Sequence, residues 1–107
     1  MQEHEALDAL SALAHPLRLK VFRALVVVGS PGLSAGSIQE GVGVPAATLS
    51  FHLKELTAAG LVSQERVGRN IVYRAAYAQM DALLGYLTEN CCSGATCAVA
   101  PAAACGC

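Results

Sequence analysis

The sequence predicts a mostly helical α+β domain that carries one small β-hairpin. Apolar residues recur at helical spacing in several segments, and two short runs with strand character flank a turn that contains glycine. Alanine supplies 20 of the 107 residues and aromatic residues only 5%, which favours closely packed helices over an aromatic-rich β-sandwich. A chain of this length supports one continuous core. We therefore expect a single folded domain over residues 1–90 and a separate tail over residues 91–107.

Local signals place the elements along the chain. The helices are expected at residues 3–13, 16–28, 35–41, 45–59 and 77–90. The strands are expected at Leu61–Arg66 and Ile71–Ala75. Pro16 fits the first turn of the second helix, Ser34 can cap the third, and Gly60 suits the left-handed end of the fourth. The periodicity of the second helix predicts that its inward residues are Leu17, Val21, Ala24, Leu25 and Val28 and that its solvated residues are Arg18, Lys20 and Arg23.

The order of these elements predicts a winged helix-turn-helix domain. A short helix, the turn Gly41–Val44 and a longer helix form the helix-turn-helix, and the hairpin forms the wing. The net charge of −1 does not by itself suggest a nucleic-acid partner. Residues 45–74, however, hold four Lys or Arg residues against two Glu, so one face of this region is expected to be basic.

Four stretches of the sequence resemble the ArsR/SmtB family of metalloregulatory repressors. They are Ala12–Leu19, Thr48–Leu53, Leu56–Val62 and Val67–Tyr73. Taken in order and at the family spacing, they cover roughly residues 5–90. The resemblance implies a homodimer that binds operator double-stranded DNA and releases it when a soft or borderline metal ion binds. We expect the dimer to form through the first and last helices.

Two sensor sites that relatives carry are missing from this sequence. Arsenic-sensing relatives have Cys-x-Cys in or just before the first helix of the helix-turn-helix, but Leu33–Glu40 contains neither cysteine nor histidine. Zinc-sensing relatives use Asp and His pairs on the last helix, which here has no histidine. The C-terminal cysteines are the remaining cluster of metal ligands, and the family also uses that variant.

The candidate DNA contacts lie on the helix-turn-helix and the hairpin. Short polar side chains can read base edges, and basic or polar groups can bind phosphates. The candidates are Ser37, Gln39, Thr48, Ser50, His52, Lys54, Arg66, Arg69 and Asn70. A packed, half-buried role is as good an interpretation of His52 as a DNA contact. Phe51 fits either contact with a thymine methyl group or packing against a neighbouring element.

Two apolar stripes are the candidate dimer interface. One lies on the first helix and the other on the last helix, and they comprise Leu7, Leu10, Leu13, Met80, Leu83, Leu84 and Leu87. If they join two copies, two recognition helices would lie about 34–36 Å apart, one turn of DNA. The alternative is that each stripe only covers the core of its own chain.

All five cysteines lie in the last seventeen residues. Their odd number and an expected reducing compartment disfavour a disulfide framework. Thiolates select soft ions, and Cys91, Cys92 and Cys97 can form a three-sulfur pyramid around As(III), with Sb(III) expected to bind similarly. Cys105 and Cys107 are possible additional ligands. A two-thiolate site for a methylated trivalent arsenical, a Zn or Cd site, a thiol redox switch and a metal-sequestering protein remain alternatives.

Other classes of protein fit the sequence poorly. No apolar run approaches the roughly 20 residues of a membrane span, and the N-terminus is acidic, so we expect a cytoplasmic protein that does not contact membranes. Small arsenate reductases use a Cys-x5-Arg loop, but Arg74 is the last arginine and precedes every cysteine. Cys-x-x-Cys is also missing. We therefore expect neither enzymatic activity nor an organic cofactor.

Overall fold

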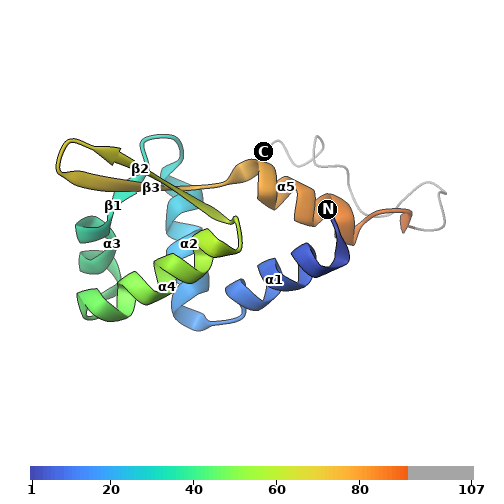
Figure 1. Ribbon diagram of the computed structural model, residues 1–107, viewed down its shortest axis with the longest axis horizontal. Coiled ribbons are helices and arrows are strands. Elements are labelled where there is room, and N and C mark those ends of the chain that lie inside the picture. Colours follow the sequence, from blue (N-terminus) through green and yellow to red (C-terminus); the bar gives the residue numbers. More distant parts are fainter. Residues whose placement is uncertain (92–107) are drawn as a thin grey trace.

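The computed structural model describes residues 1–91 and has the expected order of elements (Figure 1). The helices are α1 (Glu3–Leu13), α2 (Pro16–Val28), α3 (Ala35–Val42), α4 (Ala46–Ala58) and α5 (Tyr77–Leu87). The strands are β1 (Leu33–Ser34), β2 (Val62–Val67) and β3 (Asn70–Ala75). In Figure 1, α3, α4 and the β2–β3 hairpin occupy one end of the molecule, while α1 and α5 lie together at the other. This arrangement confirms the winged helix-turn-helix prediction.

The sheet contains a strand that the sequence analysis did not predict. Strand β1 pairs antiparallel with β3, which places Leu33 opposite Tyr73, and the strand order is β1-β3-β2. Gly32 precedes β1 with a φ of +68°, and a Cβ atom there would lie 2.6 Å from the Tyr73 carbonyl oxygen. Only glycine therefore lets the chain approach β3 so closely. Two residues are too few to show the alternation by which a strand is recognised in sequence.

The hairpin is tighter than expected. Strands β2 and β3 pair from Val62 opposite Ala75 to Val67 opposite Asn70, so only Gly68 and Arg69 form the turn. Gly68 has a φ of +62°, as turns that follow the twist of the strands require. The last pair, Val67 and Asn70, extends both strands beyond their expected ends, and Arg69 lies in the turn at the tip of the hairpin.

Large side chains from α2, from α4 and from the residue just before β2 fill the core. The fully buried ones are Val21, Leu25, Leu49, Leu56 and Leu61. Helix α1 contributes a different face, because its buried residues are three alanines at helical spacing, Ala6, Ala9 and Ala12. Small side chains let the α1 backbone lie close to its neighbours while burying little apolar area.

Two details differ from the expected helices. Phe22 is buried and Ala24 is exposed, whereas the periodicity predicted that Ala24 would face the core. The stripe actually used is Val21, Phe22 and Leu25, which buries the larger aromatic side chain. Helix α5 ends at Leu87, three residues earlier than expected, and Asn90 just beyond it has a left-handed φ of +57°.

Candidate nucleic-acid interface

Helix α4 presents polar side chains to solvent because its leucines fix how it is rotated. Leu49, Leu53 and Leu56 are buried in the core. Thr48, Ser50 and Lys54, all predicted DNA contacts, are exposed. A helix held by one apolar stripe is fixed about its own axis, so these groups have a defined place on the surface.

The two predicted contacts on α3 differ in their surroundings. Ser37 is exposed and takes part in the helix cap, since its backbone N–H donates to the Ser34 Oγ at 3.2 Å. The Ser34 hydroxyl in turn donates to the Ser37 Oγ at 3.1 Å. Gln39 is half-buried. Ser37 is therefore preorganised at the start of the helix-turn-helix.

The hairpin carries the predicted contacts Arg66, Arg69 and Asn70, all exposed. Arg69 lies in the two-residue turn, with the exposed apolar side chains Val67 and Ile71 beside it on the two strands. A narrow tip with an arginine at its end has the shape and charge to enter a minor groove or bind phosphate.

His52 is a correction to the predicted contact set. Its side chain is only 7% exposed, and its Nδ1 accepts a 3.0 Å hydrogen bond from Arg18 Nε. The His15 ring lies 4.5 Å away between centroids. Burial, then His15, then Arg18 lower the pKa of His52 below its usual 6.5, and Glu55 acts in the opposite direction. The ring is packed between helices, so it does not face DNA, and of the two open interpretations the packed one holds.

Arg18 was expected to be solvated on α2 but is half-buried. Besides bonding His52, its guanidinium carbon lies 5.7 Å from the centroid of the Phe51 ring. The Phe51 ring lies edge-on to His52 at 5.3 Å and is still 54% exposed. Phe51 thus packs on α4 and α2 while half of its surface stays open. Arg18 connects α2 to α4 through its hydrogen bond to His52. This contact could not be predicted from local sequence patterns, because Arg18 and His52 are 34 positions apart.

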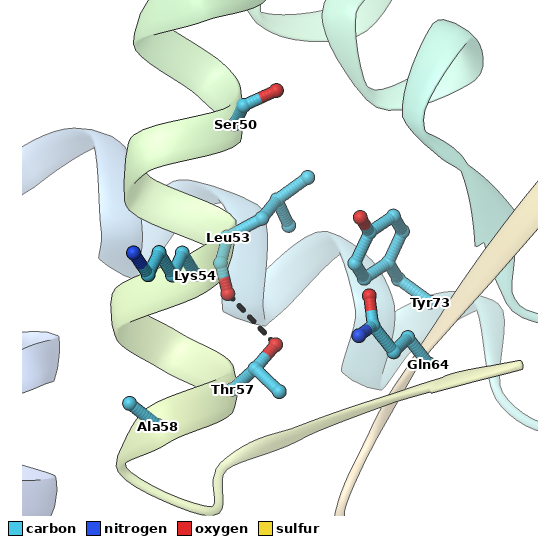
Figure 2. Close-up of a pocket in the computed structure, with 7 residues that line it drawn as sticks. All are labelled: Ser50, Leu53, Lys54, Thr57, Ala58, Gln64 and Tyr73. Atoms are coloured by element: carbon cyan, nitrogen blue, oxygen red, sulfur yellow. Dashed lines mark hydrogen bonds between the residues drawn. The ribbon is translucent and has the colours of Figure 1, made fainter.

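A groove lies between α4 and the hairpin (Figure 2). Its volume is about 410 Å³. The lining residues come from both walls and are Ser50, Leu53, Lys54, Thr57, Ala58, Gln64 and Tyr73. Thr57 is internally satisfied, since its hydroxyl donates to the Leu53 carbonyl at 2.8 Å. Gln64 and Tyr73 are polar groups beside the recognition helix that the sequence analysis did not select.

The predicted dimer stripes are mostly open to solvent. Leu7 and Leu10 on α1 and Leu84 and Leu87 on α5 are exposed, with Leu7 at 59% and Leu87 at 55%. Leu13 and Met80 are half-buried against the core. Leu83 is a correction, because it is buried in the core of its own chain and is not available to a partner. The exposed leucines thus lie on two helices that contact each other.

Of the predicted thiol ligands, only Cys91 lies in the described part of the chain. It is half-buried just beyond α5, and its backbone N–H donates to the Thr88 carbonyl at 3.0 Å. Cys92, Cys97, Cys105 and Cys107 lie outside the described residues. Within residues 1–91 no three His, Cys, Asp or Glu side chains gather into a metal site. Over the same residues, no helix is both long and apolar enough to cross a membrane.

Comparisons with known proteins agree with the helix-turn-helix architecture. A model of the helix-turn-helix domain family matches residues 13–65. The Escherichia coli HTH-type transcriptional regulator YgaV is 31% identical over 88 residues, which cover 82% of this chain and 87% of that protein.

Two solved structures share the fold. An ArsR-like transcriptional regulator from Rhodococcus sp. RHA1 is 29% identical with a TM-score of 0.74, covering 84% of this chain and 82% of that one. The homodimeric winged helix-turn-helix DNA-binding domain of Mb0332 from Mycobacterium bovis is 27% identical with a TM-score of 0.65, covering 81% of each chain. This chain therefore belongs to the ArsR-like family of winged helix-turn-helix transcriptional regulators, which are DNA-binding proteins and not enzymes.

Proposed function

We propose that the protein is a homodimeric repressor that binds operator DNA and is released when As(III), or Sb(III), binds cysteine thiolates at the end of α5. The observation that carries the DNA-binding part is the exposed polar surface of α4 beside a hairpin tipped by Arg69. Short polar groups on one helix and a cation on a narrow loop match a major groove and its neighbouring minor groove.

The homodimer part of the proposal rests on α1 and α5. Four exposed leucines on touching helices are more apolar surface than a small monomer needs, and a second copy would cover them. A two-fold axis through this surface makes it self-complementary. It would also present two α4 helices to one face of DNA, about 34–36 Å apart. The homodimeric Mycobacterium bovis domain supports the same assembly.

The effector part rests on where α5 ends. Cys91 lies four residues beyond Leu87, the end of the helix that carries the exposed leucines, so a ligand held there acts near the proposed dimer surface. Cys92 and Cys97 would complete a three-thiolate site, which suits a thiophilic trivalent ion. To cause release, the ion must bind the DNA-incompetent form more tightly than the DNA-bound form.

The test is fluorescence anisotropy of a labelled DNA fragment taken from upstream of the gene. Reduced protein is titrated, and then As(III), Sb(III), a trivalent methylarsenical, Zn(II) or peroxide is added separately. We expect As(III) and Sb(III) to release the DNA. Release mainly by the methylarsenical indicates two thiolates, whereas release by zinc or peroxide would contradict the arsenic assignment and leave the repressor. No binding to any DNA would leave a metal-binding thiol protein.

Cysteine variants locate the chemistry. Cys91→Ser, Cys92→Ser and Cys97→Ser should each abolish release by As(III) while apo binding to the operator stays intact. Ser93→Ala changes the same tail without removing a thiol and serves as the matched control, with release expected to persist. Cys105→Ser tests whether that possible additional ligand takes part. Loss of apo DNA binding in the first three variants would contradict a role confined to sensing.

A further inference from the structure

We propose that the groove between α4 and the hairpin seats one backbone phosphate of the operator, with the Gln64 amide and the Tyr73 hydroxyl as donors from the hairpin wall. The inference rests on the proposed function, since it needs α4 in a major groove and Arg69 at the adjacent minor groove. It adds two phosphate-contacting residues that lie on neither the recognition helix nor the tip of the hairpin.

The register of the hairpin places these donors. Gln64 pairs with Tyr73 across the ladder, and paired residues project to the same face of a sheet. That face continues inward to Val62 and Ala75, which are buried in the core. Both polar side chains therefore face α4, one step outward from the core, and both line the groove.

The opposite face of the hairpin is already occupied. Glu65 and Arg74 form an ion pair of 2.9 Å, and Arg74 Nε donates to the Ser30 carbonyl at 2.7 Å. The positive charge of Arg74 is thus committed to the loop before β1. Arg66, by contrast, pairs with Ile71 on the groove-facing side and is exposed, so it adds positive charge at the outer end of the groove.

The polar groups that line the groove are available for a ligand. Within residues 1–91, the side chains of Ser50, Lys54, Gln64 and Tyr73 make no hydrogen bond and no ion pair. Figure 2 shows the Ser50 and Tyr73 hydroxyls directed into the space between helix and hairpin, while the Lys54 side chain runs across α4 and its ammonium points away from the hairpin. Among residues 1–91, no carboxylate lines the groove, and Lys54 is its one cationic lining residue. A lining with neutral donors and without negative charge favours an anion.

The geometry of B-DNA makes that anion a backbone phosphate. The major and minor grooves are separated by a single sugar–phosphate strand, so a protein that places a helix in one and a hairpin tip in the other must straddle that strand. The hollow between the helix and the hairpin is the place over which the strand passes. Hydroxyl and amide side chains are common phosphate donors, and such contacts fix register on the duplex without reading sequence.

The test compares two variants with the same change in charge on opposite faces of one strand. Gln64→Glu puts a carboxylate in the groove, and Ser63→Glu puts one on the other face of β2, where Ser63 is exposed opposite Arg74. In anisotropy titrations we expect Gln64→Glu to weaken operator binding about tenfold or more. Ser63→Glu should weaken it less than about threefold. Circular dichroism melts confirm that both variants are folded.

A second measurement identifies the phosphate itself. In ethylation interference, a phosphate that sits in the groove blocks binding of the wild-type protein when it is ethylated. Ethylation of this phosphate should weaken binding of the Tyr73→Phe variant less than binding of the wild type. The variant already lacks the hydroxyl donor, and two changes to the same contact are not additive. Equal effects of the two glutamate variants, or identical interference patterns for wild type and Tyr73→Phe, would overturn the groove assignment alone. A wild-type protein that binds no DNA would overturn the proposed function and this inference with it.

Discussion

The two ends of the molecule differ in the side chains that they bury and in those that they expose. At the DNA-facing end, α2, α4 and the sheet bury large side chains such as Leu25, Leu49 and Leu56 within one chain. At the other end, the fully buried residues of α1 are alanines, and Leu7 and Leu10 are exposed, as Leu84 and Leu87 of α5 are. The first end is complete in a monomer. In the proposed function, a partner copy covers the second end, and a ligand bound there would change the spacing of the recognition helices.

Truncating a core leucine gives the largest expected effect and tests whether the DNA-facing end is self-sufficient. Leu56→Ala removes a fully buried side chain of α4 and should lower the free energy of unfolding by about 2–5 kcal/mol. Urea denaturation followed by circular dichroism measures this change. Lys54→Ala, on the exposed side of the same helix, is the control and should shift stability by less than about 0.5 kcal/mol. Equal losses in both variants would contradict the packing described for α4.

Charging the leucine surface tests the other end. Leu84→Glu places a carboxylate among the exposed leucines and should weaken dimerisation about tenfold or more while the monomer stays folded, because Leu84 is 54% exposed in one chain. Leu19→Glu on α2 is a matched control, since Leu19 is 45% exposed but lies on neither α1 nor α5. Sedimentation equilibrium reports the dissociation constant. If Leu19→Glu alone disrupted the dimer, the interface would lie on α2.

The hairpin tip gives a smaller effect that is specific to DNA. Arg69→Ala should weaken operator binding several-fold and reduce the slope of log K against log salt by about 1, as expected for one lost cation–phosphate contact. Arg23→Ala removes an exposed arginine from α2 and should leave both quantities nearly unchanged. Anisotropy titrations over a range of salt concentrations provide both numbers. An unchanged slope in Arg69→Ala would remove the tip from the interface.

The hydrogen bond between Arg18 on α2 and His52 on α4 gives the smallest expected effect, a change in the pH dependence of stability. Because the pKa of His52 is lowered in the folded protein, the unfolded chain binds more protons just below pH 6.5. This contribution to stability is present above pH 6.5 and is lost as the pH falls through the lower folded pKa. His52→Asn keeps an acceptor near the Nδ1 position but does not titrate. The pH dependence of unfolding should therefore be shallower in the variant, and identical pH profiles would contradict the coupling.

Much of the fold follows from chemistry that acts over a few residues. Pro16 begins α2 as expected, and His15 Nδ1 accepts the Leu17 N–H at 3.1 Å to cap it. Ser34 caps α3, and Gly43, with a φ of +68°, ends it. Helix periodicity, caps and turn residues depend on neighbours in sequence, so the helices and the hairpin could be located from the sequence to within a few residues.

The surroundings of individual side chains depend instead on segments that are distant in the chain. His52 is buried beside α2, where Arg18 bonds its ring, and Leu83 is buried in the core against which α5 packs. The pairing of β1 with β3 and the convergence of Gln64 and Tyr73 on α4 are likewise contacts between distant segments. Local interactions set which elements form, because each needs only nearby residues. Which face of an element becomes buried, paired or open is set by the packing of the whole chain, and no single segment carries that information.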